Sequence, residues 1–299
     1  MNSTRDLRRR IRSVKNISQV TRALETVSAR KVRQAMQLVQ QTHPYTQKAW
    51  KVLLHLAREP ERKNLNPLLT IRSKVEKVLV VMISSDRGLA GAYNVNVVRQ
   101  TLEHFRDVEV DVSYVPVGRK GRDMLLRRGR PILAEFSNLP TPPKFTDVSA
   151  IGYLLVDAYM RREVDKVYLC YTEFESMVKQ RVVIRDLLPV VLEFEKPEET
   201  RSFNITHTSK AVFEYEPDRE TILDMIVPRF IALQVFEAIL SAQASEHAAR
   251  RMAMNNATSN AKDIIDSLQL DYNKMRQKTI TDDIIEIASG AESLAQNTY

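Results

Sequence analysis

The sequence predicts an α/β protein with a long antiparallel coiled coil of N- and C-terminal helices and a central α/β domain with a mostly parallel sheet. Residues 1–43 and 229–289 contain neither Gly nor Pro and show helical spacing of apolar residues, which predicts the two helices. The middle of the chain alternates strand-like and helix-like segments. We therefore divide the 299 residues into an N-terminal helix (1–60), a central domain (74–216) and a C-terminal helix (217–299). The two helices are expected to form one discontinuous shaft.

The N-terminal helix is predicted from apolar residues that fall three or four positions apart, as one helix face requires. These are Leu7, Ile11, Val14, Ile17, Val20, Leu24 and Val27. Pro44 either kinks this helix or separates it from a second helical pattern that runs to Pro60. Residues 1–33 contain ten Lys or Arg and two acidic residues, which equals the net charge of +8 of the whole chain. Such a segment suits an acidic partner or a nucleic-acid backbone, unless it is only a solvated helix face.

The C-terminal helix is predicted from Arg229 to Ser289, with Gly290 at its end. At 1.5 Å per residue it would be roughly 90 Å long, more than a compact domain of this size can contain. One heptad column consists of Leu233, Leu240, His247, Met254, Ala261, Leu268 and Met275. The companion column is mixed, with Ala244, Arg251, Thr258, Ile265 and Tyr272. Because this pattern suits a homodimeric zipper poorly, we expect the helix to pair with the N-terminal one. The lone His247 is expected to be a seam or surface residue and no metal ligand.

The middle of the chain has the alternation of a Rossmann-like domain. Strands are expected at 77–83, 108–117, 166–174 and 180–190, and helices at 96–105, 121–128 and 147–162. Further short strands are possible at 131–136 and 213–217, with a polar loop at 193–208. This order predicts a mostly parallel sheet covered on both faces. Cys170 lies in an apolar run and is expected to be a buried hydrophobic residue.

The turn after the first strand, SSDRGLAGAY, has the position of a phosphate-binding loop but lacks its chemistry. A dinucleotide site needs G-x-G-x-x-G and an acidic residue after the second strand, and a Walker loop needs Gly-Lys-Ser/Thr. Only Gly88 and Gly91 are present, and we expect them to permit close packing. The two serines lack a nucleophile elbow, and Asp86 and Arg87 are expected to form an ion pair or to cap the turn. The sequence therefore predicts no cofactor, no metal and no active site.

The basic stretch RDLRRRIRSVKN could enter a DNA groove, but such regions lead into a regular Leu-rich zipper that is missing here. A protein socket for a shaft is the favoured interpretation, with no nucleic acid bound. A nucleotide-dependent enzyme and a nucleic-acid-binding coiled-coil protein are the alternatives. The apolar runs are too short to span a bilayer, and the N-terminus has no secretory signal, so any membrane role is expected to be peripheral.

Four stretches match one known family. They are LRRRIRSVKNISQVTRALETVSARKVRQA, SSDRGLAGAYN, YEPD at 215–218, and SEHAARRMAMNNATSNA followed by LQLDYNKMRQKTITDDIIEIASGAESL. In these the chain resembles the gamma subunit of F-type ATP synthase, the central rotor shaft. The resemblance implies a non-catalytic subunit that rotates inside a ring of alpha and beta subunits and couples ion flow to ATP synthesis or hydrolysis on the beta subunits. It also implies a foot on the c-ring beside the epsilon subunit, peripheral to the cytoplasmic side of a bacterial inner membrane.

The resemblance implies roles for individual residues where the motifs match. Contact with the beta subunits or coupling is implied for Arg276, Gln277, Thr281, Asp283, Arg250 and Leu24. Leu24 replaces a Met that the family often has, which is a volume-conserving change. Contact with the c-ring or epsilon is implied for the region of Tyr215, Glu216, Asp86, Arg87 and Gly88. Chloroplast-type members carry a regulatory cysteine pair, which the single Cys170 excludes here.

Overall fold

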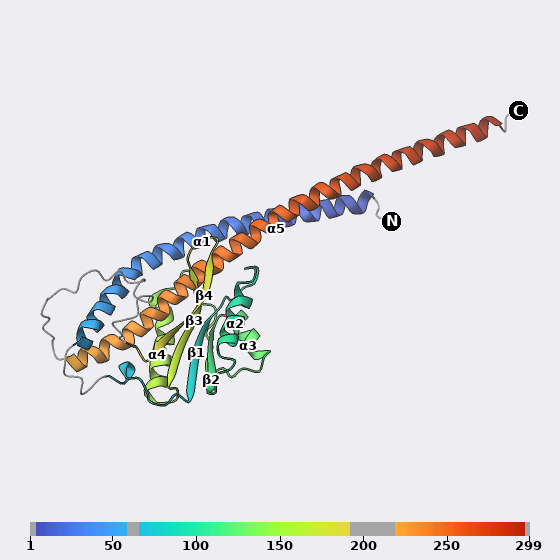
Figure 1. Cartoon of the computed structure of the whole chain (residues 1–299). Helices are drawn as coiled ribbons and strands as arrows, with labels where there is room; N and C mark the ends of the chain where they lie inside the picture. Colours follow the sequence, from blue (N-terminus) through green and yellow to red (C-terminus); the bar gives the residue numbers. More distant parts are fainter. Residues whose placement is uncertain (1–3, 59–65, 192–218, 297–299) are drawn as a thin grey trace. The chain divides into compact units, whose positions relative to one another are not determined.

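In the computed structural model, which describes residues 4–58, 66–191 and 219–296, the chain divides into two compact units. Unit 1 comprises Met1–Val27 with Arg251–Tyr299, and unit 2 comprises Ser28–Arg250. The helices α1 (Thr4–Arg58) and α5 (Arg219–Gln296) each contribute to both units (Figure 1). The division of the chain into segments 1–60, 74–216 and 217–299 stays a prediction.

Unit 2 is built on a four-stranded sheet with the order β2-β1-β3-β4. Its strands are β1 (Lys77–Ile83), β2 (Asp111–Val117), β3 (Lys166–Phe174) and β4 (Gln180–Leu188). β1 runs parallel to β2 and β3, and β4 runs antiparallel to β3, which confirms the mostly parallel sheet. The possible strand at 131–136 is reduced to isolated bridges at Ile132 and Phe136. The segments 193–208 and 213–217 lie outside the described residues.

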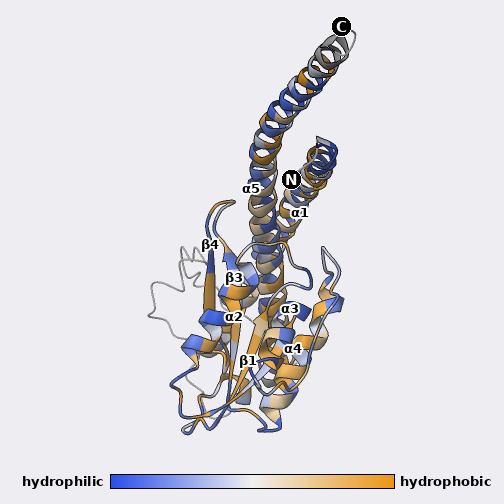
Figure 2. Cartoon of the chain, turned by 90° about the vertical axis from the view of Figure 1, so that its right-hand side faces the viewer, coloured by the Kyte–Doolittle hydropathy of each residue, from blue (hydrophilic) through white to orange (hydrophobic). Residues whose placement is uncertain are grey.

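Helices cover both faces of the sheet (Figure 1). The helices α2 (Tyr93–His104) and α3 (Arg119–Leu126) cover one face, and α4 (Phe145–Met160) and α5 cover the other. Along β1, alternate side chains join the two cores, with Val80 in one and Val81 in the other. A strand buried on both faces reads as a continuous apolar run, which is why KVLVVMI shows no polar alternation (Figure 2). The short helix η2 (Pro67–Leu69) precedes β1.

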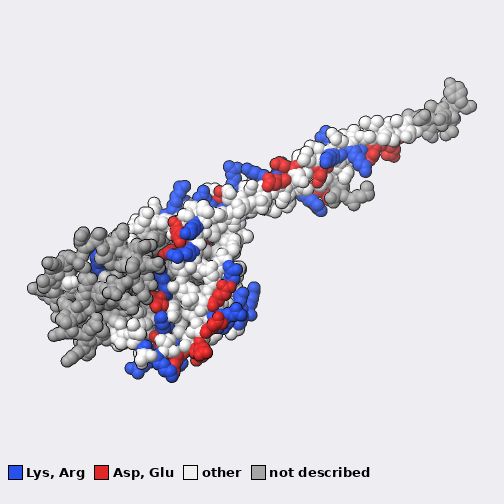
Figure 3. Space-filling view, in the orientation of Figure 1, with Lys and Arg blue, Asp and Glu red and all other residues white. Residues whose placement is uncertain are grey.

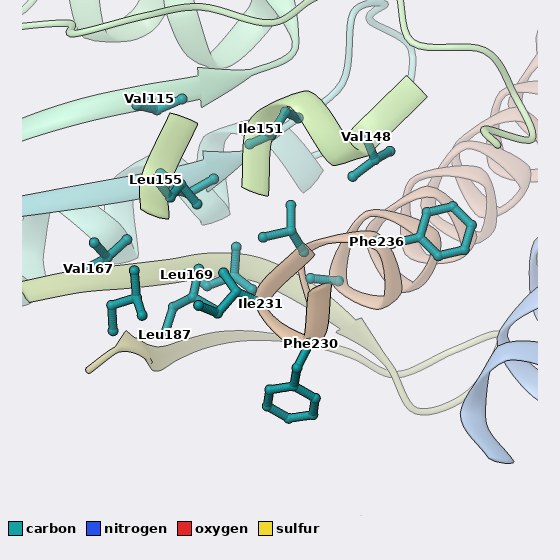
Figure 4. Close-up of a cluster of buried hydrophobic side chains, with 14 of the residues drawn as sticks. Val115, Val148, Ile151, Leu155, Val167, Leu169, Leu187, Phe230, Ile231 and Phe236 are labelled. Carbon is teal, nitrogen blue, oxygen red and sulfur yellow. The ribbon is translucent and has the colours of Figure 1, made fainter. Parts of the chain in front are cut away.

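The larger core lies between the sheet, α4 and α5 (Figure 4). Ile151 and Leu155 of α4 meet Ile231 of α5 over the strands. A Cβ added at Gly152 would lie 2.7 Å from the Cα atom of Ala232, so this glycine lets α4 and α5 approach closely. Removal of this apolar surface from water is the main force that holds α5 on the sheet.

The helices α1 and α5 are antiparallel within each unit, as predicted. In unit 1, Arg8 donates to the Tyr272 hydroxyl at 2.7 Å, and the hydroxyls of Thr21 and Thr258 are 2.7 Å apart. In unit 2, the Trp50 ring stacks on Phe230 with 5.5 Å between centroids. The predicted α5 column is buried at Leu233, Leu240, His247, Met254 and Ala261, and half-buried at Leu268 and Met275.

The buried face of α1 in unit 1 differs from the predicted one. Leu7 and Ile11 are buried, but Val20 and Val27 are 59% and 52% exposed, and Thr21 is buried in their place. Leu7, Ile11 and Thr21 lie on the helix face that a 3.5-residue period keeps against a partner helix. Val20 and Val27 lie outside this face. The prediction of a single apolar face from Leu7 to Val27 is therefore wrong.

The ends of the long helices also differ from the sequence-based boundaries. α1 continues through Pro44, so this proline does not separate two helices. α5 begins at Arg219 and contains Pro228, and it continues past Gly290 to Gln296. The predicted end at Gly290 is wrong because an interior Gly costs a helix only about 1 kcal/mol, which neighbouring helix formers can offset.

Candidate functional site

The candidate site is the edge of the sheet where the parallel strands end. In doubly wound sheets, ligands bind at this edge between strands whose connections leave in opposite directions. β1 connects to β2 on one side and is bordered by β3 on the other, so the point lies between β1 and β3. Hydrogen bonds to β3 and to Tyr93 place α5 at this point.

α5 is bonded to the end of β3 by two serines. The Phe174 backbone N–H donates to Ser241 Oγ at 3.1 Å, and Ser245 Oγ donates to the Thr172 carbonyl at 3.0 Å. Ser241 and Ser245 are four residues apart and so lie on the same helix face. Two serines at this spacing, separated only by Ala242, Gln243 and Ala244, are the sequence signal that could have marked this helix face as polar, although it does not name the partner.

Two further bonds tie the same stretch of α5 to the segments around β1 and β2. The Tyr93 hydroxyl, at the start of α2, donates to the Ala242 carbonyl at 3.1 Å. Gln243 Nε2 donates to the Pro140 carbonyl at 3.1 Å. We call the bonds made by Ser241, Ala242, Gln243, Ser245 and Arg250 of α5 the α5 joint.

Arg250 is the last member of the α5 joint. Its Nη2 lies 2.6 Å from Glu246 Oε1, and its Nη1 lies 3.0 Å from His247 Nδ1. Nε and Nη2 donate to the Gly88 carbonyl at 3.4 and 3.2 Å. The Arg250 side chain is only 11% exposed. The structure therefore brings together two predicted site residues, Arg250 and Gly88, to which the resemblance assigns contacts with different partners.

Burial changes the titration of the groups beside Arg250. Burial, with the positive charges of Arg250 and Lys31, lowers the pKa of His247 to about 3. The ring is therefore neutral near pH 7. Because Nδ1 accepts from Arg250, the ring proton resides on Nε2, which has no hydrogen-bond partner among the described residues. Burial raises the pKa of Glu246, against the opposing effect of the Arg250 guanidinium. His247 was expected at the seam or at the surface, and its burial rules out the surface.

The serines of the turn after β1 are engaged within the fold. The Gly121 N–H donates to Ser84 Oγ at 2.9 Å, and the Ser85 N–H donates to Asn94 Oδ1 at 2.9 Å. Ser85 Oγ lies within hydrogen-bond distance of the same Asn94 side chain. These contacts hold both serines within the turn.

Asp86 caps a neighbouring helix and pairs with a different arginine from the one expected. Its carboxylate accepts the backbone N–H groups of Arg119, at 3.0 Å, and Asn138, at 2.9 Å. Arg119 is the first residue of α3, where a negative charge is favourable. The Arg119 Nε atom lies 3.8 Å from the same carboxylate, so the ion pair forms with Arg119 in place of Arg87. Of the two predicted alternatives, the capping role of Asp86 is the one that the structure shows.

Gly88 of the turn does not pack closely, which corrects the prediction for this residue. A Cβ on Gly88 would meet nothing within 4 Å. Gly91 has a φ of 57°, so it serves the backbone path of the turn. The close approaches lie at Gly118 and Gly121, where a Cβ would come within 2.5 and 2.6 Å of Ser84 atoms.

The other predicted contact residues lie in unit 1 or outside the described residues. Arg276, Gln277, Thr281 and Asp283 are all exposed on α5. Leu24 is half-buried on α1 beside Glu25, whose carboxylate accepts from Asn255 at 3.3 Å. The structure thus separates Leu24 from the group that begins at Arg276. Tyr215 and Glu216 lie outside the described residues.

The described ranges also contain no group of three His, Cys, Asp or Glu residues that could hold a metal ion. Within the same ranges, no helix is long and apolar enough to cross a membrane. Cys170 is buried as predicted, and burial raises the pKa of its thiol to about 12.

Comparison with known proteins decides the family. The family model described as ATP synthase matches residues 3–294. The ATP synthase gamma chain of Roseiflexus sp. (strain RS-1) is 39% identical over 299 residues, which cover 99% of this chain and 100% of that protein. The chain belongs to the ATP synthase gamma chain family. Another gamma chain, from Halothermothrix orenii, is 36% identical over 294 residues, which cover 98% of this chain and 100% of that protein.

Solved structures of ATP synthases contain chains with the same fold as this gamma-chain family member. A chain in the central stalk and c-ring structure of Tetrahymena thermophila mitochondrial ATP synthase matches with a TM-score of 0.58 and 25% identity. That match covers 80% of this chain and 99% of the other. A chain in the OSCP/F1/c-ring structure of the Euglena gracilis enzyme matches with a TM-score of 0.67 and 20% identity, over 99% and 96% of the two chains.

Proposed function

We propose that this chain is the rotating central shaft of an F-type ATP synthase and has no catalytic site of its own. It turns inside a ring of alpha and beta subunits and stands on the c-ring beside the epsilon subunit. Through this rotation it couples ion flow to ATP synthesis or hydrolysis on the beta subunits. In a bacterium this places it on the cytoplasmic side of the inner membrane, held there through the c-ring. Membership of the gamma chain family over the full length supports the assignment.

The observation that best supports the proposal concerns the C-terminal end of α5 in unit 1. α1 begins at Thr4, and Arg8 contacts Tyr272, so in the antiparallel register α5 continues beyond the described part of α1. The α5 residues past this point expose Ile284 and Ile287, which are 61% and 73% accessible. An exposed apolar surface of this kind marks an interaction site, and a helix end that carries it needs a partner to cover it.

A second apolar stripe lies on α1 of unit 1. Ile17, Val20 and Val27 are more than half exposed, and the half-buried Leu24 lies on the same helix face. The hydrophobic effect is non-directional, so such stripes can contact a socket in several orientations without a fixed hydrogen-bond geometry. Lys and Arg lie close to Asp and Glu on the visible surface of the helices in unit 1 (Figure 3). This surface suits a shaft that must pass from one orientation to the next.

The α5 joint supports the absence of a nucleotide site in this chain. Beside the point of the sheet where a ligand would bind, Ser245 of α5 is bonded to Thr172 of β3, and Ala242 of α5 is bonded to Tyr93 at the start of α2. The turn that would hold a phosphate has its serines bonded within the fold and carries no lysine in a Walker position. We infer that nucleotides bind elsewhere in the complex.

Reconstitution tests the proposed function. The chain is combined with alpha, beta and epsilon subunits, and a probe is attached to an exposed residue of unit 2. The expected result is a defined complex with ATPase activity that depends on this chain, and a probe that rotates in one direction during hydrolysis. The proposal is wrong if no such complex forms, or if the isolated chain shows saturable binding of ATP or NAD(P). Strongly salt-dependent binding of DNA by the isolated chain would also contradict it.

A further inference from the structure

We propose that Arg250 is a positioning residue that acts within the chain. Its hydrogen bonds to the carbonyl of Gly88 attach α5 to the turn that follows β1. Force then passes between the sheet and the helix without relative movement of the two. The inference rests on the proposed rotor function and names the contact through which the shaft is joined to the α/β unit. It assigns Arg250 a partner in its own chain in place of a beta subunit.

The Arg250 guanidinium has two kinds of partner: groups on α5 that orient it, and a carbonyl in another element that accepts its hydrogen bonds. Glu246 and His247 lie on α5 itself, within one turn of Arg250. The carbonyl of Gly88 lies in another element, and it accepts from two nitrogen atoms of the same guanidinium. Glu246 is 14% exposed and Arg250 is 11% exposed, so the ion pair is shielded from water and holds the fork in one orientation. The planar guanidinium can meet all three partners at once, which a lysine ammonium cannot do with the same geometry.

The receiving carbonyl is held by a turn that is itself fixed. Ser85 Oγ donates to the Arg87 carbonyl at 2.6 Å, directly before Gly88. Asp86 is tied to the backbone of Arg119 and Asn138 on neighbouring segments. A displacement of Arg250 would therefore act on a turn that is fixed by its own hydrogen bonds. The turn would transmit the force to the sheet.

The position of Arg250 along α5 gives it a special role among the members of the α5 joint. It is the last residue of unit 2, and the other members precede it in the sequence. The bonds of Ser241, Gln243 and Ser245 join neutral groups, whereas the bond to Gly88 has a charged donor. Charge-assisted hydrogen bonds are about twice as strong as neutral ones. Arg250 thus supplies a bond with a charged donor at the end of the segment that the sheet holds.

The first test removes the hydrogen bonds from Arg250 to the Gly88 carbonyl without leaving a buried charge unpaired. In the complete ATP synthase, the chain carries Glu246→Gln with Arg250→Met, and Arg99→Met serves as a matched control because Arg99 is exposed on α2. The readout is the ratio of ion pumping to ATP hydrolysis, together with the torque against a viscous load. We expect the double variant to lower this ratio about tenfold, the effect of one charge-assisted hydrogen bond. A ratio equal to that of the Arg99→Met complex overturns the proposal.

The second test replaces the hydrogen bonds between Arg250 and Gly88 with a covalent cross-link. Gly88→Cys and Arg250→Cys are combined and joined with a short bis-maleimide. A side chain at position 88 points into open space, and the native Cys170 is buried with a pKa near 12, which keeps it unreactive. We expect coupling to be low before the link forms and to recover after it. Single-cysteine chains with the same reagent are the control.

The outcomes separate this inference from the proposed function. If coupling stays low in chains whose cross-link is complete, Arg250 acts through another partner and the inference is wrong. If the wild-type chain supports no coupled rotation, the rotor function fails, and the inference fails with it. A coupled wild type with an unaffected double variant contradicts the inference alone.

Discussion

The hydroxyls of Thr21 and Thr258 lie 2.7 Å apart in the buried seam between α1 and α5 of unit 1. Each also lies near a carbonyl of its own helix, Ser18 at 3.0 Å and Met254 at 2.9 Å. A hydroxyl has a single proton, so one threonine donates across the seam while the other donates to its own helix. A buried polar pair in a coiled coil specifies the register of the two helices at some cost in stability. This pair therefore fixes how far α1 slides along α5.

Thr21→Val and Thr258→Val test this coupling by a double-mutant cycle. Each single change leaves the opposite hydroxyl without its partner across the seam and is expected to lower the free energy of unfolding by about 1 kcal/mol. The double variant should lose less than the sum of the two, because both hydroxyls are then absent. Urea unfolding of the full chain measures the three values. Strictly additive losses would show that the two side chains do not interact.

Gly152→Ala is expected to destabilise unit 2. In a free helix this change would be favourable by about 1 kcal/mol. Here the added Cβ would lie 2.7 Å from both the Cα and the Cβ atoms of Ala232, so α4 and α5 must separate, and such overpacking costs roughly 1–3 kcal/mol. Adding Ala232→Gly removes one of the two clashing atoms and should recover part of the loss. Thermal unfolding checks both variants, and a higher melting temperature for Gly152→Ala alone would contradict the close approach.

His247 is expected to make unit 2 less stable in acid. Its ordinary pKa of 6.5 falls to about 3 in the folded chain, so below pH 6.5 the unfolded chain binds a proton that the folded chain does not. The free energy of unfolding therefore decreases as the pH falls from 6.5 towards 3. Glu246 has a raised pKa and gives the opposite slope, so the test compares variants and does not rely on one curve.

His247→Gln removes the titrating ring and keeps an acceptor for Arg250. Chemical unfolding at pH 7 and at pH 5 gives the stability change for the wild type and the variant. We expect the variant to lose less stability than the wild type between these two values. An equal loss in both would mean that the ring of His247 is protonated as easily in the folded chain as in the unfolded one.

The elements of unit 2 could be predicted from the sequence because each is defined by local pattern. The apolar run at 77–83 and the helical period at 147–162 both report burial by neighbouring layers, and the structure places a strand and a helix there. The helix boundaries were less accurate. Pro228 and Gly290 lie inside α5 because the local cost of one unfavourable residue is smaller than the gain from a long paired helix.

The partners of the α5 joint could not be predicted, because they are far from α5 in the sequence. Arg250 and Gly88 are separated by 162 positions, and the bond is to a carbonyl, which every residue type carries. The same reason explains why the ion pair of Asp86 with Arg119, 33 positions away, was not predicted. The prediction for α1 failed for a different reason: Val20 and Val27 looked like core residues, but each lies one position before a buried seam residue, Thr21 or Ser28. Hydrophobicity alone did not indicate that these residues face outward.

Arg276 and Gln277 provide the sharpest test of the predicted contact with the beta subunits. Both are exposed on the part of α5 that extends beyond the described start of α1, so they contribute little to the stability of the chain itself. Arg276→Ala with Gln277→Ala is expected to leave urea unfolding unchanged and to lower ATP synthesis and torque severalfold in the complete enzyme. The reason is that a guanidinium and an amide can hydrogen-bond a beta-subunit loop, whereas two alanines cannot.

Lys278→Ala is the matched control, since Lys278 is the next residue on the same helix, is equally exposed and has no predicted contact. If the effect came only from lost positive charge near an acidic surface, Lys278→Ala would reduce torque as much as Arg276→Ala does, and high salt would reduce both. A specific hydrogen bond predicts instead that Arg276→Lys fails to restore full torque, because the ammonium keeps the charge but loses the planar fork. Equal torque in Arg276→Ala and wild-type complexes would remove this residue from the coupling machinery and leave Gln277, Thr281, Asp283 and the exposed isoleucines of α5 as the contacts to test.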